Sequence, residues 1–289
     1  MGEPYATLDG LLPPQIAAKA EEVGVNKGRL PLVQTLMLSI LAGAFVGLAA
    51  MFCTVVLTGN GVDGAIRLPY GVVRVMGGVA FSLGLILVIV AGAELFTGNT
   101  LMVMAVANRK LSLARLAYNW SVVYVGNLIG SVVTAYLVLL TEQHRFAAGE
   151  VGKTAMAIAD AKCGLAFLPA MASGVYANAL VCLAVWLCMS CRSTTDKILA
   201  IVFPITAFVA CGFEHSVANM YFIPMGLFVA GDAAFWAERG VDLAAYSALS
   251  WSGFVRNLIP VTIGNVIGGA FFVGGVYWTI YSYAAPKEE

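Results

Sequence analysis

Charged residues are scarce in this sequence of 289 residues, where Asp, Glu, Lys and Arg together account for 11%. An average soluble domain has about 25%, so the chain lacks the charged surface that a water-soluble protein of its length needs. Apolar residues make up 60% instead. The 16 basic residues balance the 16 acidic ones, and no basic tract points to nucleic acid as a partner. The composition predicts an all-α integral membrane protein that is embedded in the lipid bilayer.

Residues that carry catalytic or metal chemistry are also few. The sequence has two histidines, and its six cysteines lie in or at the ends of apolar segments without the spacing of a metal site. No nucleophile elbow or cofactor-binding loop is present. A membrane enzyme that uses Glu214 and His215 as acid and base is disfavoured, because adjacent residues of a helix point about 100° apart. We therefore predict no enzymatic activity, no cofactor and no metal ion.

Long apolar runs divide the chain into six predicted membrane spans, because a helix needs about 20 mostly apolar residues to cross a bilayer. They cover residues 32–57, 75–104, 116–140, 164–189, 198–229 and 258–281. Residues 1–30 are polar and do not resemble a signal peptide. We interpret them as a cytoplasmic arm with a short amphipathic helix at 17–25 that lies on the membrane surface. The whole chain, 1–289, is interpreted as one transport domain that ends in a short tail, 284–289.

The two halves of the chain resemble each other, as expected for an inverted repeat. Residues 126–130 read Gly-Asn-Leu-Ile-Gly in the third span, and residues 264–268 read Gly-Asn-Val-Ile-Gly in the sixth. The second and fifth spans are each broken by a polar segment that contains one glutamate, Glu94 or Glu214. We predict a first repeat over 31–140 and a second over 163–283, with three spans each. Basic residues in the short inner loops place both termini in the cytoplasm, and we expect the cell's inner membrane.

The two breaks predict where the functional site lies. Irregular backbone is tolerated inside a bilayer where protein or a water-filled cavity satisfies its polar groups, and helix N-termini at such breaks suit an anion. His215 lies in the second break, where an ionisable residue is a functional candidate by default. Its charge changes near neutral pH, which suits a proton donor or acceptor. The alternative is a pair of packing kinks with a structural histidine.

Polar and apolar residues near the breaks are further candidates. Lys162 ends a polar loop before the fourth span, and it either reaches to the membrane interface or draws anions into a vestibule. Asn178 and Asn219 lie within spans and need hydrogen-bond partners, which helix contacts also supply. Three apolar residues form either ordinary core or hydrophobic constrictions that block hydrated ions: Phe81, Leu85 and Phe208.

Five segments carry a resemblance that covers nearly the whole chain. They are residues 93–100 (Ala-Glu-Leu-Phe-Thr-Gly-Asn-Thr), 126–127 (Gly-Asn), 177–178 (Ala-Asn), 212–220 (Gly-Phe-Glu-His-Ser-Val-Ala-Asn-Met) and 258–265 (Leu-Ile-Pro-Val-Thr-Ile-Gly-Asn). Together they resemble the formate/nitrite transporter family. Residues 11–14, 81–85 and 191–197 are similar to the formate-channel branch.

This resemblance implies an aquaporin-like fold and a homopentamer in which each protomer has its own pore. It also implies that four residues form two constrictions: Phe81, Leu85 and Leu95 on one side and Phe208 on the other. His215 would stand between them, near Thr97 and Asn178, and Lys162 would match the vestibule lysine of the family.

We therefore expect a passive or proton-coupled channel for formate or similar small anions of weak acids. Lys162 and the helix ends would attract the anion, and the dry constrictions would refuse its charged form. A carboxylic acid with a pKa near 4 is only about one part in a thousand neutral at pH 7, so a proton must come from the vestibule or from His215.

The His and Thr that often follow the lysine in formate channels are absent here, which keeps nitrite and hydrosulfide as alternatives. An aquaporin-like channel for neutral solutes is a remote alternative, because neither break contains Asn-Pro-Ala.

Overall fold

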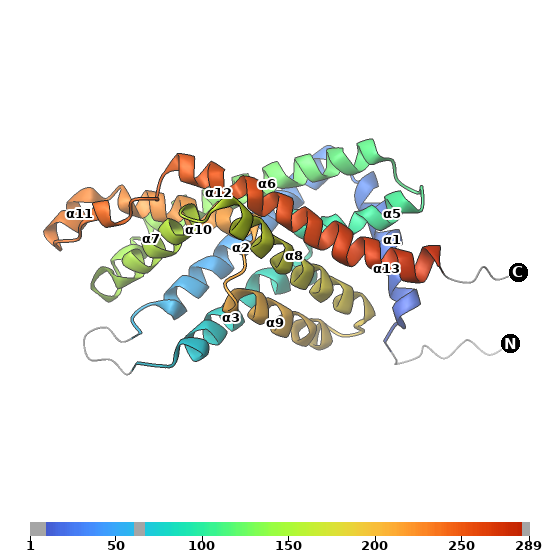
Figure 1. Ribbon diagram of the computed structural model, residues 1–289, viewed down its shortest axis with the longest axis horizontal. Helices are drawn as coiled ribbons and strands as arrows, with labels where there is room; N and C mark the ends of the chain where they lie inside the picture. The colour runs from blue at the N-terminus through green and yellow to red at the C-terminus, as the bar shows by residue number, and fades with distance from the viewer. Residues whose placement is uncertain (1–9, 61–66, 285–289) are drawn as a thin grey trace, which may run out of the picture.

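The computed structural model describes residues 10–60 and 67–284, and the regular elements of these ranges are helices. They pack into one bundle (Figure 1). Residues 1–9 of the expected arm and 285–289 of the expected tail lie outside the described residues. The first helix, α1 (Pro13–Arg29), contacts the last helical turn, η7 (Thr279–Tyr283), so the two ends of the described chain lie on one side of the molecule (Figure 1).

Within the part of the chain that the structure describes, five helices are long and apolar enough to cross a membrane. Three of them are single helices: α2 (Leu32–Leu57), α6 (Leu113–Leu140) and α8 (Phe167–Ser190). The fourth is α3 (Tyr70–Ile86), which continues as the π-helix η1 (Leu87–Gly92). The fifth is α12 (Trp251–Val266), which continues as η6 (Ile267–Gly275), α13 (Val276–Trp278) and η7 (Thr279–Tyr283). Helices satisfy their backbone polar groups internally, which lipid demands of any segment that it surrounds. The chain is therefore a multi-pass membrane protein.

Several observed helices begin before the predicted spans. α12 begins at Trp251 rather than at residue 258, and α6 begins at Leu113 rather than at 116. In both helices a serine, Ser250 or Ser112, precedes the first turn and accepts a hydrogen bond from a backbone N–H. The polar residues in these first turns lower the local hydropathy, so a hydropathy profile does not include them. The serine cap nevertheless stabilises the first turn as helix. The hydropathy runs therefore underestimated these helices at their N-terminal ends.

The helical path is interrupted at both predicted breaks. The first interruption follows Gly92, which has a φ of 87°, and the chain restarts as α4 (Phe96–Asn99), η2 (Thr100–Met102) and α5 (Val103–Ala107). The second separates α9 (Thr194–Ala210) from α10 (Ser216–Ala230) and contains Gly212, which has a φ of 73°. Glycine reaches such positive φ values at no steric cost, so a single residue ends each helix abruptly.

The N-terminal helix differs from the prediction in length and in place. α1 covers Pro13–Arg29 rather than 17–25, and it packs against α5 and α8 instead of lying only on a membrane surface. Its buried face consists mainly of small residues, such as Ala17, Ala20 and Gly24. Small residues let two helices approach closely without a large apolar stripe, which explains why the sequence pattern indicated only a short amphipathic helix.

The polar segment before the fourth predicted span is a helix and not a loop. After the short turns η3 (Gln143–Arg145) and η4 (Ala147–Gly149), the chain forms α7 (Glu150–Cys163), with Lys162 in its last turn. α7 packs against α10, where Gly226 lies against Ala159. The segment after α10 holds α11 (Ala233–Glu238) and η5 (Leu243–Ala245). α7 is amphipathic, with one face buried and charged residues on the other face. These charged residues lower the mean hydropathy of the whole segment, so the sequence indicated a polar loop.

The two Gly-Asn-x-Ile-Gly segments bring helix pairs into backbone contact. A Cβ atom at Gly130 of α6 would collide with backbone atoms of α2, and one at Gly264 or Gly268 of α12 would collide with backbone atoms of α8. Glycines spaced four residues apart allow this close approach of helices in membranes. The same motif therefore fixes α6 against α2 and α12 against α8.

Candidate functional site

His215 lies at the N-terminus of α10, inside the second break. Its Nδ1 atom accepts a hydrogen bond from the backbone N–H of Ala218 at 3.1 Å, and its Nε2 atom lies 2.8 Å from Oγ1 of Thr97. A neutral imidazole carries one proton, so with Nδ1 as the acceptor the proton sits on Nε2 and is donated to Thr97. A second proton on His215 would break the contact with Ala218. The geometry therefore holds a neutral histidine, in a site where its side chain is almost fully buried.

Thr97 comes from the first break, so this contact joins the two halves of the chain. The hydroxyl oxygen of Thr97 accepts the hydrogen bond from the Nε2–H of the histidine, so the hydroxyl group can still donate its own proton to another acceptor. Among the described residues, Asn178, the expected neighbour, forms no hydrogen bond with His215. It donates instead to Oγ1 of Thr100 at 3.1 Å and to the backbone oxygen of Asn265 at 2.6 Å, and Thr100 in turn donates to the backbone oxygen of Thr97.

One asparagine holds the backbone of each break. At the first break, Oδ1 of Asn127 accepts from the N–H of Phe96 at 2.9 Å, and its Nδ2 donates to the backbone oxygen of Glu94 at 2.9 Å. Asn127 is the asparagine of the first Gly-Asn-x-Ile-Gly segment. Buried backbone groups that leave a helix need such partners, and this side chain supplies both a donor and an acceptor.

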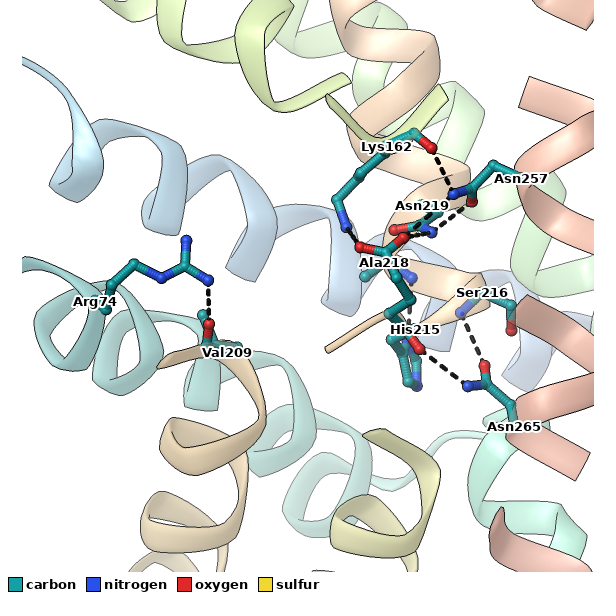
Figure 2. Close-up of polar contacts among 10 residues, drawn as sticks. Arg74, Lys162, Val209, His215, Ser216, Ala218, Asn219, Asn257 and Asn265 are labelled. Atoms are coloured by element: carbon teal, nitrogen blue, oxygen red, sulfur yellow. Dashed lines mark hydrogen bonds and ion pairs between the residues drawn. The ribbon is translucent and has the colours of Figure 1, made fainter. Parts of the chain in front are cut away.

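The second break is held in the same way. Oδ1 of Asn265 accepts from the N–H of Ser216 at 2.9 Å, and its Nδ2 donates to the backbone oxygen of Glu214 at 3.0 Å. Figure 2 shows Asn265 facing this turn below His215. The two breaks therefore have matching backbone geometry and matching partners.

A lysine, a glutamate and two asparagines form a closed network at the second break (Figure 2). Nζ of Lys162 lies 2.7 Å from Oε1 of Glu214, whose Oε2 accepts from Asn219 at 2.7 Å. Asn219 also donates to Asn257 at 2.7 Å, and Asn257 donates to the backbone oxygen of Lys162 at 2.8 Å. The lysine and glutamate side chains are 15% and 5% exposed, so this ion pair is largely withdrawn from solvent.

The first break carries the same arrangement of residue types. Nζ of Lys27 in α1 lies 2.6 Å from Oε1 of Glu94, whose Oε2 accepts from Asn99 at 2.7 Å. Asn99 donates to Asn119 at 2.9 Å, and Asn119 donates to the backbone oxygen of Lys27 at 3.4 Å. Lys27, Asn99 and Asn119 were not among the predicted site residues. Asn99 could have been predicted from spacing. It follows Glu94 by five residues, as Asn219 follows Glu214.

Two cavities approach the pair of His215 and Thr97 from opposite directions. The outer cavity, of about 530 Å³, is lined among others by Arg74, Phe81, Lys162, Phe208, Glu214 and His215. The inner cavity, of about 210 Å³, is lined among others by Lys19, Lys27, Leu85, Leu95, Asn99 and Lys197. We define the outer mouth and the inner mouth as the open ends of these cavities; the two names distinguish the cavities and assign neither to a side of the membrane. Each mouth thus carries lysine or arginine, and apolar side chains lie deeper.

Aromatic rings close the deep end of the outer cavity. The rings of Phe81 and Phe208 meet edge to face with centroids 5.5 Å apart, and Phe222 stacks on Phe81 at 6.2 Å. The centroid of Phe208 lies 5.9 Å from that of His215. Phe222 was not predicted, because one more aromatic residue in an apolar span carries no distinguishing pattern. The expected constriction residues Leu85 and Leu95 are buried on the inner side. Phe81 and Phe208 thus give one cavity an apolar, buried wall, and Leu85 and Leu95 do the same for the other.

The known proteins that resemble this chain are formate channels and related transporters. The family profile described as formate/nitrite transporter matches residues 14–279. The formate channel FocA of Escherichia coli (strain K12) is 43% identical over 276 residues, which cover 94% of this chain and 95% of that protein. A solved structure described as a pentameric formate channel with formate bound superposes with a TM-score of 0.80 at 46% identity, over 86% of this chain and 97% of its own. Another, described as an FNT family ion channel, superposes with a TM-score of 0.78 at 29% identity, over 94% and 99%.

Proposed function

Because the chain belongs to the formate/nitrite transporter family, we propose that it is a membrane channel for formate, through which the anion and its conjugate acid cross passively or together with a proton. The observation that supports this most directly is the contact between His215 and Thr97, which lies between two cavities with cationic mouths and apolar depths. Relatives with this chain's architecture are described as channels and transporters rather than enzymes.

The mechanism that we propose separates attraction from passage. The cations that line the two mouths raise the local concentration of the anion. The rings of Phe81 and Phe208 and the side chains of Leu85 and Leu95 line dry constrictions, where a bare charge loses its hydration without compensation. The neutral acid crosses them at a far lower cost.

We place the protonation step in the mouths rather than on His215. The Nδ1 atom of His215 is occupied by the N–H of Ala218, so the ring is poorly suited to store a proton. It is well suited to polarise Thr97, whose hydroxyl group would donate a hydrogen bond to a carboxyl oxygen as it passes. In this mechanism the two residues replace part of the lost hydration, and Asn178 fixes the turn that carries Thr97.

We propose that the fold is an inverted repeat of six spans, aquaporin-like, with α7 and α1 as equivalent elements of the two halves. The matching networks of Lys27 with Glu94 and of Lys162 with Glu214 support this proposal. The repeats would cover 31–140 and 163–283 of a single transport domain, 1–289. The contact between α1 and η7 is consistent with both termini on the cytoplasmic side of the inner membrane.

We also propose a homopentamer. The relative with a TM-score of 0.80 is described as pentameric, and the outward faces of α2, α3 and α12 carry many exposed large apolar residues. Such faces suit lipid and neighbouring subunits alike. Each protomer would keep its own pore, because both cavities lie within one chain.

Nitrite or hydrosulfide is the alternative substrate within the same family, because both are small anions of weak acids and the site contains no group specific for a carboxylate. An aquaporin-like channel for neutral solutes is the remote alternative. It is disfavoured by the cationic mouths, which a channel for uncharged solutes does not need.

Labelled formate flux into proteoliposomes at pH 7 and pH 5, with nitrite and hydrosulfide as competitors, tests the proposal. We expect saturable formate flux that increases at pH 5, where more of the substrate is neutral, and no such flux in empty liposomes. Negligible formate flux together with rapid nitrite or hydrosulfide flux would keep the family and overturn the substrate. Equal permeability to glycerol or water alone would favour the neutral-solute alternative.

A further inference from the structure

The lysine of the outer mouth does not provide free positive charge. Lys162 pairs with Glu214 at 2.7 Å, and Glu214 is the one carboxylate among the described residues that line the outer cavity. The pair is nearly neutral as a unit, so its field falls off quickly with distance. An anion that approaches from solvent therefore feels little net attraction from it.

Arg74 in α3 is the second cation of the same cavity. Its guanidinium group donates to two backbone carbonyl oxygens at the end of α9, that of Ala210 at 3.2 Å and that of Val209, which Figure 2 shows. In the part of the chain that the structure describes, no carboxylate lies within ion-pair distance of it. Carbonyl groups at a helix C-terminus carry about half a negative charge, so Arg74 leaves the outer mouth with net positive charge.

We propose that Arg74 recruits the permeating anion at the outer mouth, and that Lys162 acts mainly as a positioning residue that holds the second break through Glu214. This inference rests on the proposed transport of a small monovalent anion, and it holds for formate as well as for nitrite. Arg74 is half-buried at the rim of the cavity, whereas the aromatic constriction lies deeper. The guanidinium group thus acts on the approach of the anion and not on its passage.

The inner mouth has the same combination of paired and unpaired cations. Lys27 pairs with Glu94, whereas Lys19 and Lys197 line the inner cavity without an ion pair among the described residues. Nζ of Lys19 donates to the backbone oxygen of Met189 at 3.0 Å, much as Arg74 donates to the end of α9. Lys197 lies in the first turn of α9, as Arg74 lies near the start of α3. The unpaired cations therefore lie at both ends of the route.

The competing interpretation is that Arg74 only holds the end of α9, close to Phe208. The two interpretations differ in how the protein responds to salt. Recruitment by a charge is screened at high ionic strength, because the Debye length falls from about 30 Å at 0.01 M to about 3 Å at 1 M. A hydrogen-bonded helix end affects the maximal flux at every salt concentration.

The test uses labelled formate uptake by the full-length protein in proteoliposomes, measured over a range of formate concentrations. Arg74→Gln, Arg74→Lys and the wild type are compared at low and high concentrations of a salt with a large, impermeant anion. Arg67→Gln is the matched control, since Arg67 is an exposed residue of the neighbouring loop that does not line the cavity. Size-exclusion chromatography establishes that each variant assembles like the wild type.

We expect Arg74→Gln to raise the apparent KM at low salt about threefold to tenfold, as Coulomb's law gives for one charge at about 7 Å in a medium between water and a protein surface. The maximal flux should stay unchanged, and the difference should vanish at high salt. Arg74→Lys and Arg67→Gln should retain the wild-type KM.

Three results would oppose or redirect the inference. A wild-type KM for Arg74→Gln at low salt would overturn it. An equal loss of maximal flux in Arg74→Gln and Arg74→Lys at both salt concentrations would assign Arg74 to the helix end instead. If the wild type itself does not move formate, the proposed substrate has failed, and the same comparison is made with the anion that does permeate.

Discussion

The ion pair of Lys162 and Glu214 should be strongly coupled, and a double-mutant cycle measures this. The variants are Lys162→Met, Glu214→Gln and the double substitution. At 2.7 Å, Coulomb's law with an effective dielectric constant of about 20 gives an attraction of about 6 kcal/mol. Desolvation of two mostly buried groups offsets part of this attraction. We therefore expect a coupling free energy of about 2–4 kcal/mol, and a cost of about 3–5 kcal/mol for a single substitution that leaves one charge unpaired.

The same helix provides the control for this cycle. Lys153 and Glu150 of α7 also lie 2.8 Å apart, but their side chains are 38% and 22% exposed. A partly exposed ion pair with this i,i+3 spacing on a helix is worth about 0.2–0.5 kcal/mol. Unfolding titrations in detergent micelles, followed by tryptophan fluorescence, give the free energies for both cycles. The reasoning fails if the two coupling energies are equal, since burial would then have no influence on the pair.

Three further predictions concern the break, the helix contacts and the outer loop. His215→Phe removes the donor to Thr97 and should lower formate flux by a similar factor at pH 5 and pH 7, because the ring does not store the proton; a changed pH dependence would instead assign the protonation step to His215. Gly264→Ala introduces a Cβ atom against the backbone of α8 and should destabilise the protein by about 1–3 kcal/mol, whereas Gly71→Ala, at a position with open space around it, should not lower the melting temperature. The hydrogen bond from Arg145 lowers the pKa of Asp232 below its usual range, so ionised Asp232 stabilises the fold above a pH of about 4 and this contribution is lost as the pH falls through the lowered value. Asp232→Asn should accordingly show a smaller drop in melting temperature between pH 5 and pH 2 than the wild type, and an equal drop would contradict the assignment.

Much of the architecture followed from the sequence because lipid imposes a simple rule. A segment surrounded by hydrocarbon must be apolar and must satisfy its backbone internally, so long apolar runs mark helices and polar interruptions mark breaks. The positions of Glu94, Glu214 and His215 in those interruptions were readable for the same reason. The two repeated Gly-Asn-x-Ile-Gly segments were readable as an internal repeat, whereas the close helix contacts at their glycines became visible only in the structure.

Other features depended on contacts between residues far apart in the chain. The partners of Glu94 and Glu214 are lysines on α1 and α7, and neither helix has a pattern that indicates which glutamate it meets. α7 looked like a polar loop, because one charged face lowers the hydropathy of a short helix whose other face is buried against α10.

By itself, the sequence determined the membrane class, the apolar helices, the two breaks and the family. Each of these depends on residue type and local spacing, which hydropathy and backbone chemistry translate directly into structure. Only the tertiary structure decided which charges are paired. Lys162 and Arg74 look alike as cations near apolar spans, but a carboxylate neutralises the first, whereas carbonyl groups hold the second. The field at the mouth of a pore depends on such distances in space, and the order of residues along the chain does not contain them in readable form.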